Sequence, residues 1–116
     1  MRLESQKYLF DILEALNLIT EFCTGETHER YAVSAMLRSA VERQFVTAGE
    51  ALSQLAKIDP DTFERIPDAR QIVSFRNQLV HGYQVIDDLV VWGVVTNELP
   101  QLRAVVESLV DEAETP

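Results

Sequence analysis

Apolar side chains recur every three or four residues along most of this chain, the spacing that places them on one face of an α-helix. In residues 5–23 they alternate with charged positions and Gly25 follows, so this segment predicts an amphipathic helix that ends near Gly25. Thr27 is then well placed to cap the next helix. The apolar positions of the first segment are Leu9, Ile12, Leu13, Leu16, Ile19 and Phe22.

Residues 28–57 continue the same period without a proline and predict one long second helix. Gly49 lies inside it, where glycine costs roughly 1 kcal/mol relative to alanine. We therefore expect a neighbouring helix to pack closely at Gly49, with a local bend as the alternative. The apolar positions of this segment are Tyr31, Met36 or Leu37, Val41, Phe45, Ala48, Leu52 and Leu55.

Two further helical segments follow in the middle of the chain. Asp59 and Pro60 have the pattern of an N-cap with proline at the first helical position, which predicts a short helical turn through Phe63. A longer helix is expected over residues 67–81. We expect Gly82 to end it in the left-handed conformation, which glycine adopts at little cost.

The last segment contains several β-branched residues and would also suit a strand. We favour a helix, because helical spacing continues through Leu109 and no hairpin turn interrupts it. Asp87 can cap this helix, and Pro100 should kink or restart it because proline lacks a backbone donor. The β-branched positions are Val90, Val91, Val94 and Val95.

These elements predict an all-α fold, an antiparallel bundle of four to five helices. The 116 residues suffice for a single domain with one modest core, so residues 1–116 are expected to form one helical domain. A domain of this size leaves a large fraction of its surface exposed to solvent, and a partner subunit would help it to bury more apolar area. Residues 111–116 are expected to form a frayed acidic tail.

The amino-acid composition indicates which class of protein this is. Apolar residues make up 47% and charged residues 25%, which is typical of an ordinary globular protein. The first residues carry charges and no apolar stretch like that of a signal peptide, and the longest apolar run, residues 89–95, is too short to span a bilayer. We therefore expect a cytoplasmic protein without membrane association. Cys23 is the only cysteine, which excludes an intrachain disulfide and predicts a small buried apolar residue.

The net charge of −9 disfavours a protein that coats RNA non-specifically, because phosphate contacts from Lys and Arg dominate such binding. The charge is unevenly distributed, however. Residues 1–35 hold three bases against six acids and residues 84–116 hold one against seven, whereas residues 36–83 hold six against six. An anionic ligand is therefore best tolerated by the middle of the chain.

The same middle region contains the side chains whose functional groups could bind a phosphate and transfer a proton. Residues 74–83 bring together Arg76, Asn77, His81 and Tyr83. A guanidinium offers a planar fork of donors for phosphate oxygens, and an imidazole can take or give a proton near neutral pH. On a helix Arg76 and His81 lie roughly 140° apart, whereas Asn77 and His81 share a face. Arg76 must therefore reach round the helix, or the site must be assembled across a subunit boundary.

The run Arg76-Asn77-Gln78-Leu79-Val80-His81-Gly82-Tyr83 resembles the R-N-x-x-x-H-x-Y form of the Arg-x4-6-His motif of HEPN domains, as found in HepT toxins. The resemblance covers nearly the whole chain, since the flanking segments resemble the family's other helices in order. These segments are Asp11-Ile12-Leu13, Ala40-Val41-Glu42-Arg43-Gln44-Phe45, Gly49-Glu50-Ala51-Leu52, and Trp92 with Leu99-Pro100-Gln101-Leu102.

The resemblance implies a metal-independent endoribonuclease that acts as a homodimer, and no cofactor is expected. The chain lacks the Glu-x-x-His pairs that a metal site in a helical bundle would need, so no structural metal is expected either. Arg76 would position the scissile phosphate and stabilise its developing charge. His81 would act as general base or acid while the ribose 2′-hydroxyl attacks the adjacent phosphorus. DNA lacks this nucleophile and is not expected to be a substrate.

The resemblance also implies a partner. HepT-like toxins are paired with a nucleotidyltransferase antitoxin of the MntA type, in a type VII-like toxin–antitoxin system. That enzyme transfers AMP from ATP to the motif tyrosine, here Tyr83. A phosphate group beside Arg76 and His81 would occupy the anion site and repel RNA.

Simpler interpretations stand beside these. Arg76 and His81 would also be favourable cations near the negative end of a helix, and Tyr83 would also suit a partly buried aromatic position. Asn77 is expected either to orient the imidazole or the substrate, or merely to lie exposed. Arg43 and Glu50 share a helix face, where surface charge or an ion pair is favoured and lining of the cleft is the alternative.

The sequence alone also leaves two alternative functions open. The first is a non-catalytic subunit that binds a nucleotide, or presents a substrate, to a minimal nucleotidyltransferase. The second is a purely structural dimerisation module. Whatever the function, Trp92 is expected to pack in the core or at a dimer interface.

Overall fold

The computed structural model describes residues 1–82 and 86–114, and every regular element within these ranges is a helix. The all-α helical bundle predicted from the sequence is therefore confirmed. None of the described helices is both long enough and apolar enough to cross a membrane. The elements are α1 (Leu3–Cys23), α2 (His28–Val33), α3 (Ala35–Ile58), α4 (Pro60–Glu64), α5 (Ala69–His81), α6 (Asp88–Gly93), the π-helical segment η1 (Val94–Glu98) and α7 (Leu99–Glu114).

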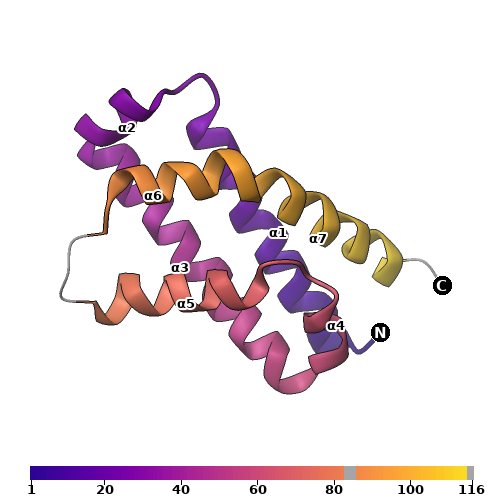
Figure 1. Ribbon diagram of the computed structural model, residues 1–116. Coiled ribbons are helices and arrows are strands. Elements are labelled where there is room, and N and C mark those ends of the chain that lie inside the picture. The colour runs from indigo at the N-terminus through magenta and orange to yellow at the C-terminus, as the bar shows by residue number, and fades with distance from the viewer. Residues whose placement is uncertain (83–85, 115–116) are drawn as a thin grey trace.

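Helices α1 and α3 run in opposite directions and pack along much of their length (Figure 1). Helix α5 packs against α3, and α7 packs against α1. The molecule measures 46 × 30 × 19 Å, so its shortest dimension corresponds to about two helix diameters. The core lies where these helices pack together, and its fully buried side chains include Leu9, Ile12, Leu16 and Ile19 of α1 and Val41, Phe45, Leu52 and Leu55 of α3.

The long second helix predicted over residues 28–57 is wrong in one respect, because the chain breaks at Ser34. Ser34 has an extended backbone, and its hydroxyl accepts a hydrogen bond from the Leu37 amide at 3.1 Å. The break separates α2 from α3 and lets Tyr31 lie fully buried against Trp92, with ring centroids 5.6 Å apart. The apolar period continues across the break and so did not reveal it.

The predicted caps at Thr27 and Asp59 are confirmed. The Thr27 hydroxyl accepts from the Arg30 amide, and the Asp59 carboxylate accepts from the Thr62 amide at 3.2 Å. Asp59 also accepts from the hydroxyls of Ser5 at 2.8 Å and Thr62 at 2.7 Å. These bonds tie the start of α4 to α1 and lower the pKa of the Asp59 carboxyl, with the Thr62 hydroxyl as the main cause.

Helix α5 ends at His81 as predicted, but Gly82 is not left-handed. Its φ of −75° and ψ of 131° are extended, and its amide donates to the Gln78 carbonyl at 2.8 Å. A Cβ at Gly82 would lie 2.3 Å from that carbonyl oxygen. Lack of space, rather than backbone handedness, therefore favours glycine at this position.

The last segment is helical rather than extended, and the Asp87 carboxylate caps it by accepting from the Leu89 amide at 2.8 Å. The kink or restart expected at Pro100 takes the form of the π-helical segment η1 directly before α7, because the backbone stays helical through Leu99. The expected frayed tail does not begin at Asp111. Helix α7 continues through Glu114, and the Glu112 carboxylate binds the Arg65 guanidinium at 2.8 and 3.0 Å.

Candidate active site

Helix α5 carries three of the predicted site residues, and Gly49 sets how closely it approaches α3. A Cβ at Gly49 would lie 2.3 Å from the Cβ of Arg76 and 3.3 Å from the Ile72 carbonyl oxygen. Only glycine leaves room for the crossing at this separation. Of the two explanations offered for Gly49, close packing is the one confirmed.

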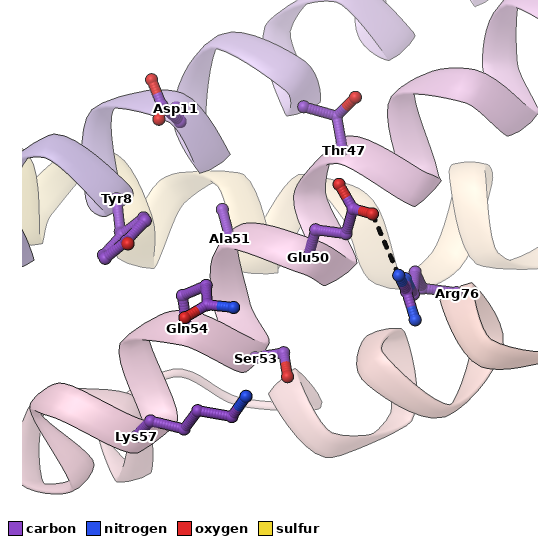
Figure 2. A pocket seen from close by; sticks show the side chains of 9 residues that line it. All are labelled: Tyr8, Asp11, Thr47, Glu50, Ala51, Ser53, Gln54, Lys57 and Arg76. Atoms are coloured by element: carbon purple, nitrogen blue, oxygen red, sulfur yellow. Dashed lines mark hydrogen bonds and ion pairs between the residues drawn. The ribbon is translucent and has the colours of Figure 1, made fainter.

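The Arg76 guanidinium is held by two acceptors. One terminal nitrogen donates to the Glu50 carboxylate at 2.9 Å (Figure 2). The other donates to the Asn77 side-chain oxygen at 3.0 Å. The Arg76 side chain is only 22% exposed, and its Nε is buried without a hydrogen-bond partner among the described residues. The side chain is thus fixed in orientation while part of its donor capacity remains unused.

A polar cavity of about 570 Å³ lies beside this ion pair. Its walls come from α1 and α3, and Arg76 closes one edge from α5 (Figure 2). Tyr8 and Asp11 line it from α1, and Glu50 and Lys57 line it from α3. The cavity therefore places two cations, two carboxylates and a phenol ring around one open space.

A second polar cavity of about 210 Å³ lies near the end of α5, lined by Arg38, Glu42, Asp88 and Gly82 among others. Burial raises the pKa of the Glu42 carboxyl, and the charge of Asp88 raises it further. One cation faces two carboxylates there, so this cavity is less suited to an anion than the cavity at Arg76.

The structure brings together some of the predicted site residues and leaves others apart. Arg76 and Asn77 are in direct contact, whereas His81 is exposed at the end of α5 and does not line the cavity at Arg76. Tyr83, predicted as the modification site, lies outside the described residues.

Glu50 is the residue whose position relative to Arg76 the sequence did not reveal. The ion pair expected for it exists, but its partner is Arg76, 26 residues away, and Glu50 also lines the cavity. Arg43 is exposed on α3 and is not among the residues that line this cavity. Gly49 inside a long helix is the local signal that pointed to a close crossing here, and it did not identify Arg76 as the partner of Glu50.

Two other groups in the core have altered acidity. Burial, with the charge of Glu26, raises the pKa of the Cys23 thiol to about 11, in keeping with the expected apolar role of this residue. Burial also raises the pKa of the Tyr31 phenol, as does Glu42. Neither group lines the cavity at Arg76. Within residues 1–82 and 86–114, no three His, Cys, Asp or Glu side chains are grouped as metal ligands would be.

Comparison with known proteins assigns the family. The model of the HepT-like ribonuclease family matches residues 12–109. "Putative RNase MJ1380" of Methanocaldococcus jannaschii is 31% identical over 100 residues, which cover 86% of this chain and 91% of that protein. "Probable ribonuclease HepT" of Thermococcus cleftensis is 31% identical over 112 residues, 94% and 98% of the two chains. No solved structure matches with statistical significance. This chain belongs to the HepT-like ribonuclease family.

Proposed function

We propose that this protein is a metal-independent endoribonuclease and the toxin of a type VII-like toxin–antitoxin pair, with Arg76 and His81 as its catalytic residues. The observation that carries the proposal is the Arg76 guanidinium, held at the edge of a polar cavity by Glu50 and Asn77. Two of its five N–H donors serve these acceptors and the Nε–H is buried, so the two remaining N–H bonds of the terminal nitrogens are the ones proposed to bind a phosphate. Membership of a ribonuclease family supports RNA as the substrate.

In the proposed reaction the ribose 2′-hydroxyl attacks the adjacent phosphorus. His81 takes the proton of the 2′-hydroxyl as general base, or gives a proton to the departing 5′-oxygen as general acid. Arg76 stabilises the negative charge that develops on the phosphate oxygens. The bond from phosphorus to the 5′-oxygen breaks, which leaves a 2′,3′-cyclic phosphate and a 5′-hydroxyl.

The protein acts as a homodimer in this proposal, because one chain does not supply the whole site. Arg76 faces α3, whereas His81 lies on the exposed side of α5. The same side carries Asn77 and Val80, and Val80 is 44% exposed. Pairing two copies through this side of α5 would bury Val80 and bring His81 of one copy toward Arg76 of the other.

Neutralisation occurs at Tyr83 in this proposal. An MntA-like nucleotidyltransferase transfers AMP from ATP to the phenol oxygen and releases pyrophosphate. If Tyr83 is only the acceptor, Tyr83→Phe retains RNA cleavage within a small factor and abolishes AMP incorporation. If the phenol instead binds the transition state, the same change lowers cleavage by roughly 10²-fold.

The test of the main proposal is incubation of purified protein with RNA in the presence of EDTA. We expect cleavage that leaves 2′,3′-cyclic phosphates and is lost in Arg76→Ala and His81→Ala. Products with 5′-phosphates that require Mg²⁺ would contradict the mechanism.

One observation favours a second function. The net charge of −9, with a carboxylate bound to Arg76, suits a non-catalytic subunit that binds a single nucleotide for a nucleotidyltransferase. That function predicts nucleotide binding with no RNA cleavage by the wild-type protein, under conditions in which it remains folded.

A further inference from the structure

We infer that the cavity beside Arg76 is a nucleotide subsite, in which Lys57 binds a second phosphate of the RNA and Tyr8 stacks on the base between the two phosphates. This inference rests on the proposed ribonuclease function and names how the substrate strand is held. The cavity's volume of about 570 Å³ lies within the range of sites that bind small ligands, and a single nucleotide fits it.

The two cations reach this cavity from different helices, Lys57 from α3 and Arg76 from α5 (Figure 2). Lys57 follows Glu50, the partner of Arg76, by two helical turns, which corresponds to about 10 Å along the axis of α3. Cations anchored two helical turns apart suit a nucleoside with a phosphate at each end better than a single phosphate, with its 3′ or 5′ phosphate on Arg76 and the other on Lys57.

The ring of Tyr8 supplies the surface for the base. Tyr8 lies on α1, lines the cavity, and packs against the core while remaining partly exposed (Figure 2). Bases stack on such rings irrespective of sequence, because every base has a π-face. A helix therefore presents an aromatic surface to the same cavity that Lys57 and Arg76 line.

The carboxylates of the cavity limit its affinity for phosphate groups and make it selective among the bases. Glu50 is already bound to Arg76, so its charge is largely compensated there. Asp11, one turn after Tyr8 on α1, places an acceptor near the base position. A carboxylate accepts from the amino group of adenine, cytosine or guanine. Uracil has no amino group and offers only its ring N3–H, so we expect the subsite to favour the other three bases over uridine.

The experiment measures binding separately from cleavage. The protein is the full chain with His81→Ala, and the probe is a fluorescein-labelled ten-nucleotide adenylate RNA, titrated at several salt concentrations. We expect Lys57→Ala to weaken binding and to reduce the slope of log K against log salt by about 0.7, the contribution of one phosphate contact in a single strand. Lys7→Ala removes the same charge from α1 outside this cavity and should leave the slope unchanged.

Tyr8 is tested with two variants that preserve packing. Tyr8→Leu should raise the dissociation constant about tenfold through loss of stacking, whereas Tyr8→Phe should retain binding. Asp11→Asn should narrow the difference between adenylate and uridylate probes. Thermal melts show whether each variant is folded.

The inference is overturned if the probe does not bind, or if Lys57→Ala and Lys7→Ala change the salt slope equally. It is also overturned if the folded Tyr8→Leu variant binds as tightly as its parent. Cleavage by the wild-type protein together with any of these results leaves the proposed function intact and rejects only the subsite. Tight binding that depends on Lys57 and Tyr8, without any cleavage by the wild-type protein, rejects the ribonuclease function and with it the assignment of this site to a substrate strand.

Discussion

Gly49 lies directly beneath Arg76 where α3 crosses α5, and a Cβ at Gly49 would lie 2.3 Å from the Arg76 Cβ. The next residue, Glu50, binds the guanidinium of the same arginine. One glycine and its neighbour thus set both the distance between the helices and the orientation of the cation proposed to bind the scissile phosphate.

We expect Gly49→Ala to displace α5 and to lower both stability and activity. Overpacking at a close crossing costs about 1–3 kcal/mol, and misplacement of Arg76 should reduce kcat/KM for RNA by roughly tenfold or more. The measurements are thermal or denaturant unfolding and single-substrate cleavage kinetics. Gly93→Ala is the matched control, since a Cβ there has no heavy atom within 4 Å and should leave cleavage unchanged. Equal behaviour of the two variants would contradict this role for Gly49.

Glu50→Ala should show that Glu50 orients the Arg76 guanidinium but contributes little to the free energy of unfolding. The Glu50 side chain is 56% exposed, so loss of the ion pair should cost less than about 1 kcal/mol of unfolding free energy. Cleavage should fall by roughly tenfold, because the guanidinium loses the acceptor that orients it. In the double variant with Arg76→Ala, the Glu50 change should weaken binding of a labelled RNA no further than Arg76→Ala alone does. Additive losses of binding would show that Glu50 acts independently of Arg76.

A site shared between two copies predicts complementation. Arg76→Ala and His81→Ala should each be inactive, and a mixture allowed to exchange subunits should regain about a quarter of wild-type activity. Half of the dimers in such a mixture are mixed, and each of these has one intact pairing of arginine and histidine. Sedimentation of the wild-type protein at micromolar concentration should show a dimer. A dimeric protein whose mixed variants remain inactive would place both residues of each site in one chain.

Asp59 should make stability depend on pH in the acid range. Hydrogen bonds from Thr62 and Ser5 lower its pKa in the folded state, so its stabilising effect is full above the unfolded pKa of about 3.9 and is lost as pH falls through the folded pKa. We expect Asp59→Ala to cost about 1 kcal/mol at pH 7. The gap between variant and wild type should narrow below pH 4 in denaturant titrations. Asp61→Ala, at an exposed position in the same short helix, should show a much smaller loss at pH 7.

The sequence by itself determined the helices and most of their ends. Caps at Thr27, Asp59 and Asp87 are legible because each cap is a contact between residues two or three positions apart. The buried faces of α1 and α3 follow from apolar spacing for the same reason. The motif of residues 76–83 likewise identified α5 as the helix that carries Arg76, Asn77 and His81.

Tertiary structure alone decided the break at Ser34, the backbone of Gly82 and the surroundings of Arg76. The apolar period is the same whether residues 28–57 form one helix or two, and burial of Tyr31 against Trp92 is visible only in the folded chain. The pairing of Arg76 with Glu50 depends on how two helices cross, and no local pattern encodes a contact across 26 residues. Short-range hydrogen bonds and periodicity can be read along a chain, whereas a cavity between three helices arises only from their packing.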